Sequence, residues 1–269
     1  MGIVVAIVNR KGGVGKTTTT FNLGTAFAKG GHRVLLVDLD PQKASLTHLA
    51  RIEDPDYTVA DALSHYLKER TPAPLDTMVI SLAPHLDLLA GSADLDSAEI
   101  RLASVLKREH VLAGALADAR ARYDVVLIDC GPSMGVLVVN AMTAADEVLI
   151  PVEGAYLAAV GLGDLLDTVA DVRREEINAD LRVGGIILTK VEANRHGRDI
   201  VAGVRAAFED TAIPILREVK KSTKVNEASQ ARQSILDYAR RDAAALAYAD
   251  IADALTEAWA VPPIGGGRG

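Results

Sequence analysis

The sequence predicts an α/β fold with a doubly wound, mostly parallel β-sheet flanked by helices. Short apolar segments rich in Val, Ile and Leu have the pattern of strands buried on both faces, at residues 3–9, 33–38, 124–129, 147–152, 182–188 and 213–216. Segments with helical periodicity alternate with them, at residues 17–29, 97–122, 156–177, 197–209 and 242–259. This alternation is typical of right-handed βαβ units, which build parallel sheets.

The composition is that of a globular protein, with 269 residues of which 49% are hydrophobic and 24% charged. A net charge of −7 argues against a uniformly basic surface but leaves room for a local basic patch. The single cysteine, Cys130, excludes an internal disulfide and a multi-cysteine metal site, and it suits the reducing cytoplasm. No apolar run approaches the ~18 residues of a membrane-spanning helix, so we expect a cytoplasmic protein.

We expect one domain over residues 1–260, followed by a disordered tail over 261–269, VPPIGGGRG, which cannot continue a helix. The proline-rich stretch 52–96 is less regular than the rest. It is predicted to leave the main sheet and to carry a short helix at 58–69, with two short edge strands near 78–82 and 86–90. The sequence shows no internal repeat.

The sharpest motif is KGGVGKTT, residues 11–18, between the first strand and the first helix. It fits the phosphate-loop pattern G-x-x-x-x-G-K-[ST] once the first glycine is relaxed to Lys11-Gly12. Its glycines let backbone N–H groups wrap phosphate oxygens, Lys16 suits the β- and γ-phosphates, and the Thr17 hydroxyl suits Mg²⁺. The sequence therefore predicts a P-loop NTPase-like fold with an ATP site formed by Lys11, Gly12, Gly13, Val14, Gly15, Lys16, Thr17 and Thr18.

Three acidic residues lie at the ends of predicted strands: Asp38 and Asp40 in VDLDPQ, and Asp129 in VVLIDCG. Ligands of open α/β sheets bind at this carboxyl-end rim. Asp129 and Asp38 suit a magnesium ion held with Thr17, the two carboxylates acting through water, and Asp40 suits orienting the attacking water. These residues together predict magnesium-dependent ATP hydrolysis.

The ordered series KGGVGKTTTTFNLG, RVLLVDLDPQ, LDLLAGS, YDVVLIDCGPS, NAMTAADEVLIPV and NEAS resembles the ParA/MinD group of deviant Walker A ATPases, and most of all the ParA (Soj-like) DNA-partitioning ATPases. The resemblance implies that Lys11 reaches the phosphates of a partner subunit's ATP, so that Lys11, Lys16 and Asp40 are the catalytic residues of a slow ATPase. It also implies an ATP-sandwich homodimer. A ParB-type centromere-binding protein is the implied activator of hydrolysis.

The resemblance further implies ATP-gated, non-specific binding to double-stranded DNA and association with the nucleoid. Candidate DNA contacts are the basic residues of two stretches, KVEANRHGR and LREVKKSTKVNEA: Lys190, Arg195, Arg198, Arg217, Lys220, Lys221 and Lys224. The sequence departs from the group's usual residues at Arg10, Gly131, Ala155 and Val160.

Other members of this fold group fit less well. Nitrogenase iron protein needs two cysteine ligands per subunit, which Cys130 alone does not supply. MinD-type proteins end in a basic membrane-binding helix, whereas segment 242–259 has acidic residues and no Lys or Arg, so we expect no membrane partner. The main alternative is a ParA-like ATPase that positions a protein or membrane cargo. A metabolic ATP-dependent ligase is a third class, but the sequence shows no small-molecule pocket for it.

Overall fold

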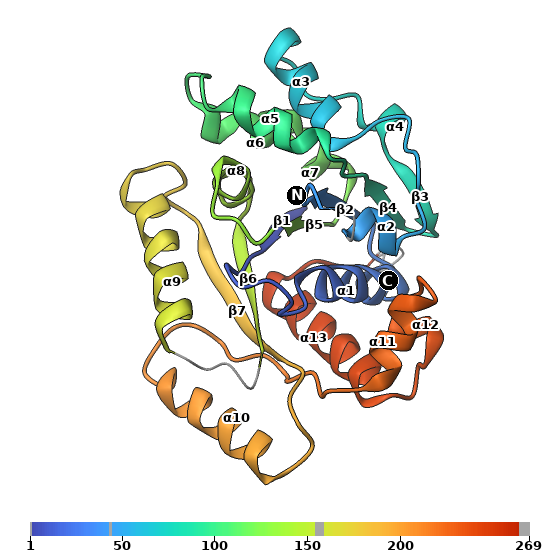
Figure 1. Ribbon diagram of the computed structural model, residues 1–269, viewed down its shortest axis with the longest axis vertical. Coiled ribbons are helices and arrows are strands. Elements are labelled where there is room, and N and C mark those ends of the chain that lie inside the picture. Colours follow the sequence, from blue (N-terminus) through green and yellow to red (C-terminus); the bar gives the residue numbers. More distant parts are fainter. Residues whose placement is uncertain (1, 43–44, 154–158, 264–269) are drawn as a thin grey trace, which may run out of the picture.

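A seven-stranded sheet, with the order β3-β4-β2-β5-β1-β6-β7, forms the centre of the protein (Figure 1). The computed structural model describes residues 2–42, 45–153 and 159–263, except for the side chains of 159–161. The strands are β1 (Ile3–Ile7), β2 (Val34–Leu39), β3 (Ile80–Ala83), β4 (Leu86–Leu89), β5 (Val125–Cys130), β6 (Glu147–Glu153) and β7 (Arg182–Thr189). All neighbours are parallel except β3 and β4. The predicted doubly wound, mostly parallel fold is confirmed.

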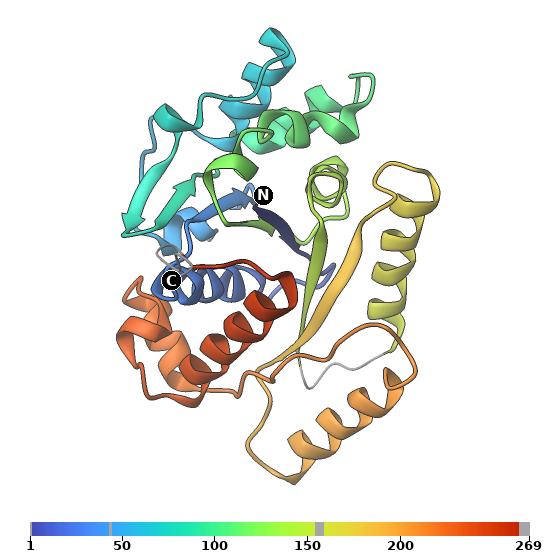
Figure 2. The ribbon, with the colours of Figure 1, turned by 180° about the vertical axis from the view of Figure 1, so that it is seen from behind.

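Helices cover both faces of the sheet because alternate strand residues point to opposite faces (Figures 1 and 2). Val4 and Ala6 face one core, and Val5 and Ile7 face the other. The first core is covered by α3 (Val59–Glu69), α4 (Leu75–Met78), α5 (Asp94–Leu102), α6 (Val111–Ala115), α7 (Ala119–Arg122), α8 (Val136–Ala144), α9 (Ala159–Arg174) and α10 (Arg195–Ala207). The second is covered by α1 (Lys16–Lys29), α2 (Leu46–Leu49), α11 (Thr223–Gln230), α12 (Ile235–Tyr238) and α13 (Ala243–Trp259).

The stretch 52–96 has the expected short helix and two short strands, but the prediction that it leaves the main sheet was wrong, and only β3 is an edge strand. A capping box of Thr58 and Asp61 begins α3, and Thr58 is extended there. Strand β4 pairs in parallel with β2, and β3 then pairs with β4, so this stretch extends the sheet at one edge. The predicted excursion therefore contributes two strands to the main sheet.

Two predicted elements were wrong. Segment 213–216 is not a strand: Ile215 makes only an isolated parallel bridge to Ile186, and Pro214 has no N–H with which to build a ladder. The single helix predicted over 97–122 is divided into α5, a 3₁₀ turn (Arg108–His110), α6 and α7. Lys107, with φ 55°, is left-handed directly before the 3₁₀ turn, a conformation that does not occur inside a right-handed helix.

The apolar face of α13 belongs to the core. Ile251 and Leu255 are buried, and the Trp259 ring lies 5.5 Å from that of Phe27 on α1. Within the described residues, no helix is both long and apolar enough to cross a membrane. Of the predicted tail, residues 261–263 form neither helix nor strand, and 264–269 lie outside the described residues.

Candidate active site

The loop between β1 and α1 has the backbone conformation of a phosphate loop. Gly13, with φ 75°, and Gly15, with φ 93°, are left-handed, a conformation that glycine adopts at no steric cost. Gly15 directly precedes the first residue of α1, so the loop leads into a helix N-terminus, where free N–H groups and the helix dipole favour anions. The predicted residues 11–18 therefore comprise a glycine turn and the start of α1, an arrangement that suits an anion.

The loop is tied to the ends of β6 and β7. Asn9 accepts the backbone N–H of Lys11 at 2.9 Å and donates to the Pro151 carbonyl at 2.7 Å. On the other side, Thr189 Oγ1 donates to the Val14 carbonyl at 2.7 Å. Sequence reasoning missed Thr189, although its place at the carboxyl end of an apolar strand put it on the expected rim.

Lys16 is buried under the loop, and its Nζ donates to the Lys11 carbonyl at 3.3 Å. Burial lowers the pKa of Lys16, and the nearby charges of Asp129 and Asp40 oppose that shift. A lysine held here is placed to bind phosphate oxygens that enter the loop.

Asp38 is completely buried and held by Thr47, the second residue of α2. Its Oδ2 accepts the Thr47 backbone N–H at 2.7 Å and the Thr47 hydroxyl at 2.5 Å, and its Oδ1 accepts the Asp40 backbone N–H at 3.2 Å. Burial raises the pKa of Asp38, while hydrogen bonds from Ser45 and Thr47 oppose the rise. The carboxylate is thereby fixed beside the loop.

Asp129 has the donor chemistry of a cation site. Its Oδ1 accepts a hydrogen bond from Thr20 Oγ1 at 3.2 Å, and its buried Oδ2 has no hydrogen-bond partner within the described part of the chain. Burial, reinforced by the charge of Asp38, raises the pKa of Asp129 to about 8, and a hydrogen bond from Thr17 opposes this. Because carboxylate and hydroxyl oxygens are preferred by Mg²⁺, Thr17, Asp38 and Asp129 fit a magnesium ion.

Asp40 lies on the same rim, and its Oδ1 accepts the Gln42 backbone N–H at 3.0 Å. A Cβ atom at Gly131 would come within 3.3 Å of that oxygen, so the glycine leaves space beside the carboxylate. The structure brings together the loop, Lys16 and the three acidic residues, as the sequence predicted.

Lys11 is half-exposed, and its Nζ lies 3.3 Å from Glu153 Oε2 at the end of β6. Arg10 forms an exposed ion pair with Asp164 on α9 at 3.2 Å. Of the other departures from the group's pattern, Ala155 and the side chain of Val160 lie outside the described residues.

The two basic stretches lie side by side. An isolated parallel bridge joins Val191 to Lys220, and the backbone N–H of Lys221 donates to the Val191 carbonyl at 2.9 Å. Arg195 and Arg198 are exposed on α10, which begins just beyond this bridge. The two basic stretches are therefore neighbours at residues 191 and 220, and Lys190 of the first stretch contacts the phosphate loop at the Gly13 carbonyl.

Most of these basic side chains already contact acidic neighbours. The ion pairs are Lys221–Glu192 and Lys224–Glu227, both at 2.7 Å, Lys220–Glu218 at 3.2 Å, Arg195–Asp199 at 3.8 Å, and Arg217–Asp250. Lys190 differs from the other candidates because its Nζ donates to the Gly13 carbonyl of the loop at 2.6 Å. Exposed ion pairs contribute only about 0–1 kcal/mol, so phosphate groups can displace them at little cost.

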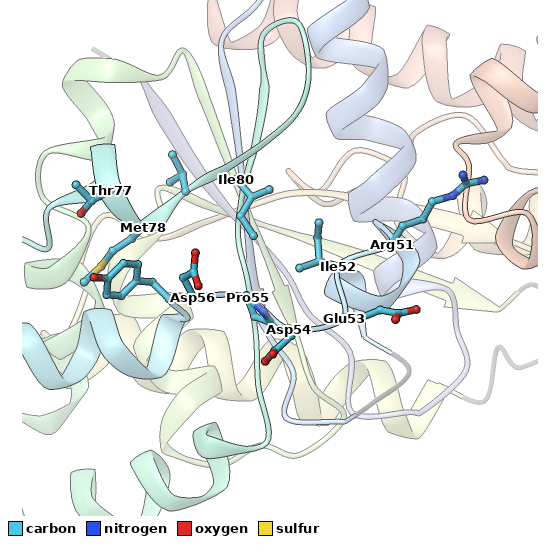
Figure 3. A pocket seen from close by; sticks show the side chains of 11 residues that line it. Arg51, Ile52, Glu53, Asp54, Pro55, Asp56, Thr77, Met78 and Ile80 are labelled. Carbon is cyan, nitrogen blue, oxygen red and sulfur yellow. The ribbon is translucent and has the colours of Figure 1, made fainter.

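A separate cavity of about 350 Å³ lies between residues 51–57 and residues 77–80. Figure 3 shows the carboxylates of Glu53, Asp54 and Asp56 and the apolar side chains of Ile52 and Ile80 around it. None of the site residues predicted from the sequence lines this cavity.

Comparison with known proteins agrees with this geometry. A family model described as an AAA domain matches residues 2–183. The chain is 37% identical to the sporulation initiation inhibitor protein Soj of Bacillus subtilis, over 94% of this chain and 97% of Soj. The chain belongs to the ParA/Soj family of ATPases. This ParA/Soj-family chain is also 39% identical to the chromosome partitioning protein ParA of Caulobacter vibrioides, over 93% of this chain and 92% of that protein.

A solved structure from Mycobacterium smegmatis superposes on this ParA/Soj-family chain with a TM-score of 0.80 and 33% identity, covering 98% of each chain. It is described as a cobyrinic acid a,c-diamide synthase with bound ADP and magnesium. Family membership confirms the resemblance inferred from the ordered motifs.

Proposed function

We propose that this chain is a DNA-partitioning ATPase that uses ATP and magnesium as a switch for binding DNA. The observation that carries this proposal is the rim itself, where a glycine loop with buried Lys16 meets the adjacent carboxylates of Asp38 and Asp129. The name of the Caulobacter vibrioides relative, chromosome partitioning protein ParA, supports DNA as the cargo.

In the proposed site the loop binds the phosphates, and the acidic residues hold the metal ion and orient the attacking water. Backbone N–H groups of residues 12–18 and the Lys16 ammonium bind the phosphates, and Thr17, Asp38 and Asp129 hold Mg²⁺, with water between the carboxylates and the ion. Bound magnesium neutralises phosphate charge. Asp40 orients the attacking water. Slow turnover suits a protein whose ATP-bound state must persist while it holds DNA.

Dimerisation is the proposed consequence of ATP binding. The Lys11–Glu153 pair is 40% and 29% exposed at its two side chains, so exchanging Glu153 for a partner's phosphates costs little. A lysine supplied in this way acts as an arginine finger does, and it makes hydrolysis depend on the second subunit. Each nucleotide then stabilises the dimer.

DNA binding follows from dimerisation because a dimer presents two copies of the basic surface. Each phosphate contact contributes about −0.9 to the slope of log affinity against log salt, so one copy binds weakly at physiological salt. In a dimer, binding of the first basic surface to DNA raises the effective concentration of the second surface near the DNA, so the dimer binds DNA more tightly than one copy does. Contacts with phosphates alone do not distinguish one base sequence from another, which suits a protein that moves over the nucleoid. A ParB-type partner is the proposed activator that ends the DNA-bound state.

The experiment below also distinguishes two alternative functions, the positioning of a protein or membrane cargo and a metabolic ligase activity. A protein that positions such a cargo would use the same ATP-dependent switch. The name of the M. smegmatis structure suggests amide synthesis, which needs a substrate pocket beside the phosphates. The cavity of Figure 3 and a second cavity, of about 490 Å³ beside Glu147 and Trp259, are not lined by the rim acids.

The function is tested by replacing the gene in its host with an Asp40→Ala version. If the protein partitions DNA, this variant should give daughter cells that lack the chromosome or the plasmid. A fluorescent fusion of the variant should stay on the nucleoid. Normal DNA inheritance with a misplaced protein assembly would favour the cargo alternative. Normal inheritance with a growth requirement for a small metabolite would favour the ligase.

A further inference from the structure

We propose that Thr189 and Lys190 are positioning residues that hold the phosphate loop in its anion-binding conformation. This inference rests on the nucleotide site proposed above and deepens it. It also gives Lys190 a role other than the DNA contact expected from the sequence.

Two consecutive residues, the last of β7 and the one that follows it, hold consecutive carbonyls of the loop. Thr189 Oγ1 donates to the Val14 carbonyl at 2.7 Å, and Lys190 Nζ donates to the Gly13 carbonyl at 2.6 Å. Thr189 Oγ1 is also 3.2 Å from the Val152 carbonyl of β6, so this contact links the loop to two strands. The contact of Lys190 spans 177 positions in sequence, which makes it a tertiary contact of the folded sheet.

Holding these carbonyls also orients two donors. A trans peptide is planar, with its C=O and N–H on opposite sides. The Gly13 carbonyl shares a peptide with the Val14 N–H, and the Val14 carbonyl shares one with the Gly15 N–H. When β7 draws both carbonyls toward itself, the two N–H groups point away from β7. Successive N–H groups that converge in this way form an anion-binding nest.

The backbone of Lys190 supports a fixed role. Its φ of 53° is left-handed, a conformation that is uncommon for lysine and persists where the surrounding structure enforces it. A hydrogen bond from an ammonium group is stronger than one from a neutral donor. Lysine therefore suits the contact with the Gly13 carbonyl, which is the more exposed of the two. Thr189 is buried and makes the inner contact.

The test measures ATP and ADP binding by calorimetry with Mg²⁺ for Lys190→Met and Lys190→Arg. Loss of one charge-assisted hydrogen bond predicts an increase of about fivefold or more in both dissociation constants for Lys190→Met. Lys190→Arg keeps a charged donor and should stay within about twofold of the wild type. At saturating ATP, the salt slope of DNA binding should be unchanged in Lys190→Met, because this lysine contacts the loop.

A second pair of variants tests the inner contact. Thr189→Val loses the hydroxyl and should weaken binding of both nucleotides, whereas Thr189→Ser keeps it and should not. Unchanged nucleotide affinity in both Lys190→Met and Thr189→Val would overturn the inference. So would unchanged affinity in Lys190→Met together with a salt slope reduced by about 0.9 per subunit, the result for a DNA contact. A wild-type protein that fails to bind ATP would instead overturn the proposed function.

Discussion

Asp38 and Asp129 are register partners at the carboxyl ends of the adjacent parallel strands β2 and β5. Both residues are fully buried, and the charge of Asp38 adds to the burial that raises the pKa of Asp129. Two neighbouring buried carboxylates are unfavourable unless a cation, a proton or hydrogen bonds compensate them. We therefore expect magnesium bound at the proposed site to stabilise the protein.

Asp129→Asn should stabilise the metal-free protein and abolish ATP hydrolysis. The pKa of Asp129 in the folded protein, about 8, lies well above the usual aspartate value of about 4, so the stability that its protonated form contributes is lost as pH rises from about 4 to 8. At pH 8 without magnesium, we expect the variant to be more stable by about 2 kcal/mol in urea unfolding. The exposed Asp118→Asn is the control, and a destabilised Asp129→Asn would contradict the electrostatic account.

Lys16→Ala should abolish nucleotide binding, because the buried ammonium is the charged donor inside the loop. Calorimetry with ATP and Mg²⁺ measures the effect. Lys29→Ala is the control, since Lys29 lies at the far end of the same helix in an exposed pair with Asp237. Wild-type ATP affinity in Lys16→Ala would contradict the phosphate-loop assignment.

Asp40→Ala should leave ATP binding and dimerisation intact and slow hydrolysis by about 10²-fold or more, the usual contribution of a positioned acid–base group. Light scattering in ATP should show a dimer that persists for longer than the wild-type dimer. Normal turnover would show that another residue orients the water.

Replacing Lys221 and Lys224 together by Glu should remove DNA binding while ATPase activity persists. Both side chains are exposed and pair with Glu192 and Glu227, so the change adds like charges to one surface. The double substitution of the exposed Lys68 and Lys107 by Glu changes the net charge equally and is the control. Retained DNA binding in the Lys221 and Lys224 variant would place the DNA surface elsewhere.

Asp124→Asn should destabilise the protein at pH 7 and destabilise it less as the pH falls below about 4. Burial opposes ionisation of Asp124, but hydrogen bonds from the Arg33 side chain and backbone prevail and lower its pKa below 3.8. Stability from a depressed carboxyl pKa is present above the unfolded value and lost as pH falls through the folded one. We expect a loss of about 1 kcal/mol at neutral pH. An equal loss at pH 7 and at pH 3 would show that the charge is irrelevant.

Contiguous patterns were the reliable part of the sequence prediction. The phosphate loop and five of the six predicted apolar strands depend on neighbouring residues, and each lies where its pattern predicts it. Helix α8 was missed because it is buried on several sides and lacks the polar face that defines a helical period.

Long-range contacts were beyond the sequence pattern. Thr47 fixes Asp38 from nine residues away, and Lys190 reaches Gly13 from 177 residues away. Such contacts depend on which strands become neighbours, and strand order is a property of the whole sheet. The basic stretches were identified from charge, but the sequence did not show that Lys221 of one stretch pairs with Glu192 of the other, or that Arg217 pairs with Asp250 on α13.

The most direct test of the central claim is binding to random-sequence duplex DNA in ATP with Mg²⁺, in ADP and without nucleotide, across a salt series. The account predicts strong binding only in ATP, with a steep salt slope, because only the ATP-bound dimer presents two basic surfaces together. Equal binding in all three states, or no binding by a protein that still dimerises in ATP, would contradict an ATP-gated DNA switch.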